Sequence, residues 1–151
     1  MPIDYEYVVC TEDQVIEWAR AIRQGDEGAQ DHCEGQMAEM VGLGAITPRD
    51  VEGLYCSARG EGLVETMTYR VASAADPSGS WVIGFEPRLR TVLSILQVGD
   101  TLVEVWRHAM RAASGEKAPE EALTVGAAEA IVELFALAAV EERCQVFACR
   151  Y

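Results

Sequence analysis

Lysine is nearly absent from this chain. Of its 12 basic residues only Lys117 is a lysine, and the bases face 25 acids, which gives a formal net charge of −13. Between Gln24 and Pro48 there is no base at all. Because such a field repels phosphate backbones, the composition disfavours direct nucleic-acid binding. It favours a basic protein as partner, although an excess of acid also maintains solubility without any partner.

The familiar catalytic and nucleotide-binding motifs are also missing. The sequence has no GxGxxG or GxxxxGK[ST] loop to hold phosphates, no GxSxG nucleophile elbow and no HExxH zinc motif. We therefore predict no cofactor and no metal. The absence lowers the expectation of an enzyme from the common classes and leaves other catalysts open.

Signals for export, disulfide formation and membrane insertion are lacking too. Acidic Asp4 and Glu6 stand where a secretory signal would carry basic and then apolar residues. The five cysteines are odd in number and form no CxxC pair, so we expect free thiols in a cytoplasmic protein. The longest apolar stretch, residues 127–140, is interrupted by Glu129 and Glu133 and is shorter than the roughly 20 residues that a membrane span requires.

That apolar stretch organises the rest of the chain. It belongs to the segment 118–143, which is helical in pattern and apolar on nearly every side. A helix of this kind is buried in a core, so we predict a central core helix near residues 119–143. The stripe formed by Glu129 and Glu133 continues through Ala136 and Val140, where we expect the helix face to become buried.

The remaining patterns predict a single globular domain over residues 1–151, of ordinary composition. The fold class is α+β, with a small, mostly antiparallel sheet of about four strands packed against about six helices. The expected strands are residues 3–9, 63–71, 81–85 and 145–151. The expected helices are residues 11–25, 26–43, 47–60, 87–99, 100–113 and 119–143.

Three local signals support the helix boundaries. Thr11 and Gln14 form a capping box, in which each side chain satisfies a backbone N–H at the start of a helix. Thr47 followed by Pro48 marks a second helix start. Asp76 to Gly79 is a turn signal that predicts a hairpin between strands 63–71 and 81–85.

The acidic charge is concentrated near the N-terminus. Residues 1–44 hold ten acids and two bases, a net charge of −8. Within the expected helix 26–43, Asp26 is in the capping position, and Glu27, Asp31 and Glu34 are spaced four and three apart, which places them on one outer face. We predict that these four acids bind a basic partner.

Candidate catalytic side chains are few. Cys10 precedes a helix start, where backbone N–H groups favour a thiolate, but it also fits the end of a core strand. Glu129 and Glu133 are either a buried acid pair or an exposed stripe. His108 follows Glu104 by four residues, as an exposed ion pair would, and His32 lies among acids that cannot converge on one metal.

Three hypotheses follow. The first is a small cytoplasmic binding protein, such as an immunity protein, antitoxin or other inhibitor, that engages a basic protein through its acidic N-terminal region. The second is a small enzyme or ligand-binding domain with a pocket between sheet and helices. The third is a domain that self-associates, as a homodimer, through exposed strand edges.

Overall fold

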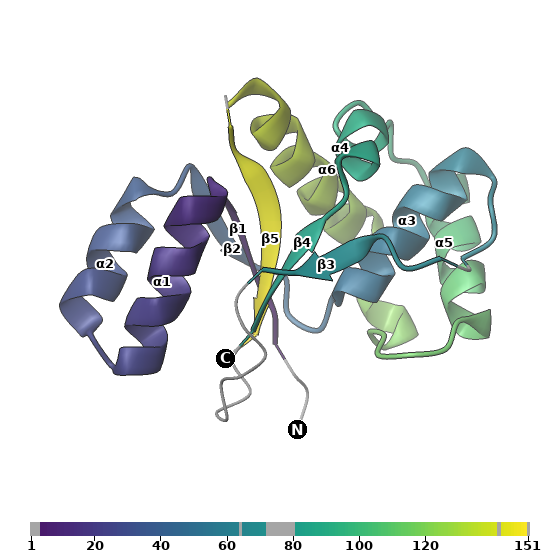
Figure 1. The fold of residues 1–151 in the computed structure, drawn as a ribbon. Helices are drawn as coiled ribbons and strands as arrows, with labels where there is room; N and C mark the ends of the chain where they lie inside the picture. The colour runs from purple at the N-terminus through teal and green to yellow at the C-terminus, as the bar shows by residue number, and fades with distance from the viewer. Residues whose placement is uncertain (1–3, 64, 72–80, 142, 151) are drawn as a thin grey trace.

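The computed structural model describes residues 4–63, 65–71, 81–141 and 143–150. Its described residues form a five-stranded antiparallel sheet between two layers of helices (Figure 1). The fold is therefore α+β as predicted, with one strand more than expected. The strand order is β2-β1-β5-β4-β3, and the strands are β1 (Glu6–Cys10), β2 (Glu39–Gly42), β3 (Thr68–Arg70), β4 (Trp81–Phe85) and β5 (Gln145–Arg150).

The helices are divided unevenly between the two faces of the sheet. One face carries α1 (Glu12–Gln24) and α2 (Glu27–Gln36), and the other carries the remaining helices (Figure 1). These are α3 (Pro48–Arg59), α4 (Pro87–Leu93), α5 (Asp100–Ala112) and α6 (Val125–Val140), with a 3-10 turn at Glu120–Ala122. In the described part of the chain, no helix has the length and apolar character needed to cross a membrane.

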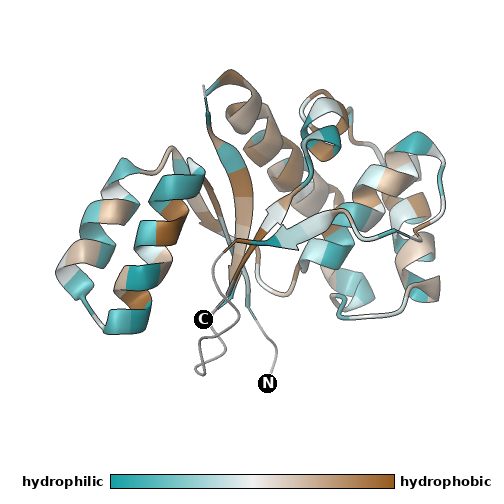
Figure 2. Ribbon diagram, viewed as in Figure 1, coloured by the Kyte–Doolittle hydropathy of each residue, from teal (hydrophilic) through white to brown (hydrophobic). Residues whose placement is uncertain are grey.

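Alternation along β1 builds both layers of the core. Tyr7 and Val9 join the larger core beneath α3 to α6, whereas Val8 and Cys10 join the smaller core beneath α1 and α2. Successive strand residues point to opposite faces, so a strand that is buried on both sides is apolar at every position. Figure 2 shows the contrast between the apolar central strands and the largely hydrophilic α1 and α2.

Local capping signals are confirmed. The Thr11 hydroxyl accepts from the Gln14 backbone N–H at 3.2 Å, and the Gln14 side-chain oxygen accepts from the Thr11 N–H at 2.8 Å. Thr47 and Asp50 form the equivalent box at the start of α3. Gly25 ends α1 in the left-handed conformation, with φ of 68°, which glycine adopts at little cost.

The expected helix 26–43 is wrong in its second half. Helix α2 ends at Gln36, Met37 takes an extended conformation, and residues 39–42 form the fifth strand, β2. The strand is stabilised by antiparallel pairing with β1, in which Tyr7 lies opposite Val41. That pairing partner is more than 30 residues away along the chain, so the helical spacing of apolar residues could not reveal it.

The expected strand 63–71 is also too long. Among the described residues only 68–70 form β3. At Met67 the pairing is incomplete, since its carbonyl accepts from the Glu86 N–H at 2.9 Å but its own N–H donates to the Glu52 carboxylate. The antiparallel pairing of β3 with β4 is confirmed, with Tyr69 opposite Gly84. Both the turn signal at residues 76–79 and the start of the first expected strand at residue 3 lie outside the described residues.

Helix α6 is shorter than the expected helix near 119–143. The Thr124 hydroxyl accepts from the Ala127 N–H at 3.1 Å and begins the helix there, and the helix ends at Val140. It contacts α4, α5, β1 and β5, so its core role is confirmed. The expected burial at its C-terminal end is wrong, since Val140 is 79% exposed.

Candidate functional site

Three of the four predicted partner-binding acids are exposed on α2. The Asp26 carboxylate caps the helix by accepting from the Ala29 N–H at 3.0 Å, and it remains accessible to solvent. Glu27 and Asp31 follow on the exposed surface, four residues apart. The structure thus places these side chains where a partner's cations have access to them.

Glu34 differs from the other three acids. It is partly buried, and its Oε1 atom accepts from the Trp18 indole N–H and from the Gln30 amide, both at 3.3 Å. Trp18 belongs to α1 and is 1% exposed, so Glu34 ties α2 to α1. Its carboxylate is therefore engaged within the protein and is less available to a partner than the other three.

Charge is distributed unequally between the two layers. The salt bridges among the described residues all lie between residues 49 and 150, where each joins an arginine to a glutamate. No acid of α1 or α2 takes part in one of these salt bridges. Residues 12–36, which form this layer, hold seven acids and two bases, Arg20 and Arg23, a net charge of −5. The layer therefore forms a surface of negative potential.

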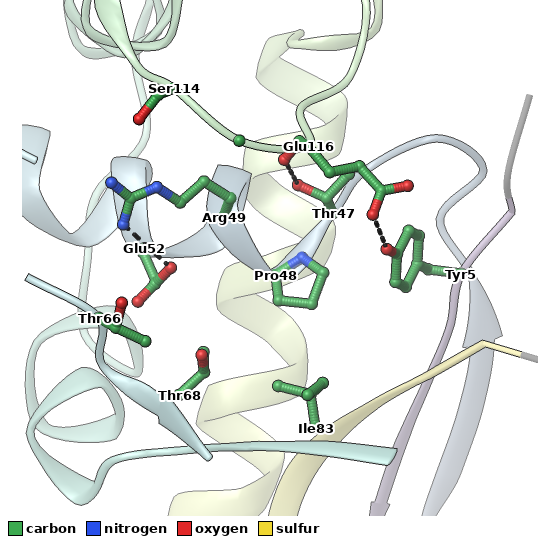
Figure 3. Close-up of a pocket in the computed structure, with 11 residues that line it drawn as sticks. Tyr5, Thr47, Pro48, Arg49, Glu52, Thr66, Thr68, Ile83, Ser114 and Glu116 are labelled. Carbon is green, nitrogen blue, oxygen red and sulfur yellow. Dashed lines mark hydrogen bonds and ion pairs between the residues drawn. The ribbon is translucent and has the colours of Figure 1, made fainter. Parts of the chain in front are cut away.

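A second candidate site is a polar cleft of about 360 Å³ on the opposite side of the sheet. It lies between the N-terminal end of α3, strands β3 and β4, and the segment 114–116 (Figure 3). Hydroxyl groups of Thr66, Thr68 and Ser114 line it, together with the guanidinium of Arg49. This volume is within the range of small-molecule sites, about 300–1,000 Å³.

Hydrogen bonds fix the two ends of the cleft. At one end Tyr5 donates its hydroxyl to Glu116 Oε2 at 2.8 Å, and Arg150 lies 3.5 Å from the same oxygen (Figure 3 shows Tyr5 and Glu116). At the other end Arg49 lies 3.4 Å from Glu52 Oε1 and donates to the Glu65 carbonyl at 3.3 Å. Both ends are thus formed by pairs of side chains that restrain each other.

A buried carboxyl group supports the floor of this region. Asp50 is completely buried, and its Oδ2 atom accepts from the backbone N–H groups of Thr47 at 2.8 Å and Ala118 at 2.9 Å. The Thr47 hydroxyl donates to the Glu116 carbonyl at 2.9 Å. Burial raises the pKa of Asp50 above its usual range, and the hydrogen bonds from Thr47 and Ala118 oppose that rise. These bonds hold the segment 116–118 against the start of α3.

Sequence reasoning did not identify this cleft. The capping pattern of Thr47 and Asp50 is visible in the sequence, but it predicts only a helix start. Glu52 is 3% exposed, and nothing in the local sequence distinguishes it from a surface glutamate. The cleft depends on contacts between segments as far apart as residues 5, 47, 68 and 116.

The structure does not make Cys10 a reactive thiol. Cys10 is fully buried at the end of β1. Burial in the core raises its pKa to about 12, with smaller contributions from Cys144 and Cys33. A nucleophilic cysteine requires a lowered pKa, so the interpretation of Cys10 as the end of a core strand holds.

The other residues considered for chemistry are exposed on the surface. Glu129 and Glu133 are exposed on α6, and so is His108 on α5. The expected ion pair between Glu104 and His108 is not formed in the described structure; Glu104 forms a salt bridge with Arg107. Around His32, and elsewhere in the described chain, no three side chains of the metal-binding types come close enough to hold an ion.

Comparison with known proteins adds no functional assignment. Searches of protein-family models, curated proteins and solved structures find no match to this chain.

Proposed function

We propose that this protein is a small acidic binding protein of the inhibitor or immunity-protein type, which engages a basic protein partner through the layer formed by α1 and α2. The observation that carries the proposal is the charge distribution described above. Exposed Asp26, Glu27 and Asp31 have no cationic partner among the described residues, whereas salt bridges between arginines and glutamates stabilise the opposite layer. We place the protein in the cytoplasm, where its five free thiols would stay reduced.

Charge would act mainly on the rate of association. Exposed ion pairs contribute only about 0–1 kcal/mol each, so the affinity must come largely from apolar contacts around them. Long-range attraction between an acidic and a basic surface speeds encounter, and salt screens it over about 8–10 Å. A function of this kind needs no catalytic group.

The test compares two doubly neutralised variants. Glu27→Gln with Asp31→Asn removes two charges from α2 without touching Glu34, which packs against Trp18. Asp100→Asn with Glu121→Gln removes two charges from exposed positions outside that layer. The wild type is used to isolate basic partners from an extract of the source organism, and surface plasmon resonance then gives association rates at low and physiological salt.

We expect the α2 variant to associate more slowly than the wild type at low salt, with a smaller difference at physiological salt. The control variant should stay close to the wild type. Equal association rates for all three proteins at both salt concentrations would refute the proposal, provided that circular dichroism shows all three folded.

The polar cleft supports a second candidate function, the binding of a small polar metabolite. The specific observation is the group of hydroxyls and the guanidinium that converge on one cavity between sheet and helices (Figure 3). Thr68→Val removes one hydroxyl at nearly constant volume. If the cleft binds such a ligand, a compound from a panel of small polar metabolites will raise the melting temperature of the wild type, and Thr68→Val will reduce that shift. If no compound raises the melting temperature, or if Thr68→Val shows the same shift as the wild type, ligand binding in this cleft is refuted.

A further inference from the structure

Strand β2 leaves one edge of the sheet open. It is the terminal strand, and its only neighbour in the described sheet is β1. The Leu43 N–H donates to the Tyr5 carbonyl at 3.2 Å. Because alternate residues of an antiparallel strand direct their backbone groups to the same side, Met40 and Gly42 direct theirs away from β1, toward the open edge.

A groove of about 140 Å³ runs beside this edge, between β2 and α6. Its apolar lining comes from partly buried Val41 and Leu137 and from buried Leu134. Two exposed carboxylates, Glu39 on the strand and Glu133 on the helix, stand at its rim. The groove therefore combines an apolar floor with negative charge on both sides.

No positive charge balances those carboxylates from within the elements that form the groove. Neither the segment 24–48, which contains β2, nor helix α6 includes a lysine or arginine. Glu129 adds a third exposed carboxylate one turn before Glu133. Among the described residues, none of these three glutamates forms a salt bridge.

We propose that the groove between β2 and α6 binds an extended basic segment of the protein partner, which adds a strand to the β2 edge. The inference rests on the proposed function, since it specifies how a basic partner is held. Lysine or arginine side chains suit the groove because their aliphatic stems cover apolar surface while their charged ends reach acids at the rim. Backbone hydrogen bonds to an exposed edge supply affinity that is independent of side-chain identity.

Glu39 protects the edge while no partner is bound. Its carboxylate accepts from the outward N–H of Met40 at 3.0 Å, and charged groups that block an edge in this way discourage unspecific pairing. A cation that draws the Glu39 carboxylate away exposes the N–H to the incoming strand. Gly42, the other residue whose backbone faces the open edge, is exposed to solvent.

The same charges argue against a second copy of this chain as the occupant. Pairing two β2 edges brings together two strands that are each flanked by Glu39 and Glu133, and no lysine or arginine of β2 or α6 offsets the repulsion between the copies. Each copy also carries a net charge of −13. A basic segment gains from both features, whereas a homodimer is opposed by both.

The test uses a synthetic peptide of about ten residues with alternating lysine and valine, long enough to span an ordinary strand. A second peptide of the same sequence is N-methylated at alternate residues, which keeps its charge but removes backbone donors on one edge. Binding to the full-length, isotope-labelled protein is followed by amide chemical shifts and by hydrogen exchange. Size-exclusion chromatography with light scattering reports the oligomeric state.

We expect the first peptide to shift amides of residues 39–43 and 130–137 and to slow exchange at Gly42. The N-methylated peptide should bind about tenfold more weakly or worse, because it loses backbone hydrogen bonds to the strand edge. Glu39→Gln with Glu133→Gln should weaken the first peptide, and the control Asp100→Asn with Glu121→Gln should not.

Four results would overturn the inference. Shifts confined to α1 and α2 would leave the proposed function standing and remove only the groove. Equal binding of both peptides, or no binding of either, would exclude strand addition, and the proposed function would still be judged by association with the natural partner. A dimer without peptide, protected at Gly42, would assign the edge to a second copy.

Discussion

Replacement of the buried Asp50 tests the most constrained part of this structure. In Asp50→Ala the backbone N–H groups of Thr47 and Ala118 lose their acceptor in a buried site. Each unsatisfied group costs about 1–3 kcal/mol, and loss of the helix cap is included in that sum. We expect the free energy of unfolding to fall by about 3–5 kcal/mol, a large part of the ~5–15 kcal/mol that such a domain has.

Asp50→Asn separates hydrogen bonding from charge. The amide oxygen of asparagine still accepts from Thr47 and Ala118, and its NH₂ group takes the place of Oδ1, which has no partner among the described residues. We expect a loss of about 1–3 kcal/mol at a pH well below about 3.9, the ordinary aspartate pKa, where the wild-type carboxyl is protonated and equally neutral.

The pH dependence of the difference between wild type and Asp50→Asn follows from the raised pKa of Asp50. Between the unfolded pKa, about 3.9, and the higher folded pKa, the native state holds more protons than the unfolded state. The contribution of Asp50 to stability is therefore complete below the unfolded pKa and is lost as the pH rises through the folded pKa. The wild type should lose stability relative to Asp50→Asn over that window.

Urea denaturation of the three proteins at several pH values, followed by circular dichroism, measures these differences. The comparison between wild type and asparagine variant cancels the titration of all other groups. If the wild type instead becomes more stable relative to Asp50→Asn as the pH rises, the hydrogen bonds lower the pKa of Asp50 by more than burial raises it. A loss below about 1 kcal/mol in Asp50→Ala would show that water replaces the lost acceptor.

Two further predictions concern the core and the thiols. Leu134→Ala and Phe135→Ala should each reduce the free energy of unfolding by about 2–5 kcal/mol, because both side chains are buried and the ring centroids of Phe135 and Phe85 lie 5.6 Å apart in an edge-on arrangement. Replacement of the exposed Glu129 by alanine should change it little. Equal, small losses for all three variants in urea denaturation would contradict the placement of α6 in the core. Thiol titration of the denatured, unreduced protein should count all five cysteines, whereas in the native protein partly exposed Cys144 should react before buried Cys10, whose pKa burial raises to about 12.

The elements that sequence analysis predicted well are those with local signals. Thr11 and Thr47 cap their helices through residues three positions away, and Gly25 ends α1 through its own backbone conformation. Such signals act within one helical turn and do not depend on the rest of the fold. The apolar character of α6 also predicted a core helix, but its cap at Thr124, a local signal of the same kind, was overlooked.

The elements that sequence analysis missed depend on distant partners. Strand β2 exists because residues 39–42 pair with β1, and strand propensity is decided largely by such neighbours. The candidate sites show the same division. The sequence located Asp26, Glu27, Asp31 and Glu34 in an acidic segment, but packing against Trp18 distinguished Glu34 from the others.

The sequence by itself determined the excess of acidic residues, the number of cysteines and the helix caps, because each is a property of composition or of neighbouring residues. Only the tertiary structure decided which acids are paired with arginines, which carboxyl groups are buried and where the sheet ends. The groove between β2 and α6 and the cleft around Arg49 and Glu116 both arise there. They are formed by segments brought together through strand pairing and core packing, and the free energy of those contacts is not encoded in any single stretch of chain.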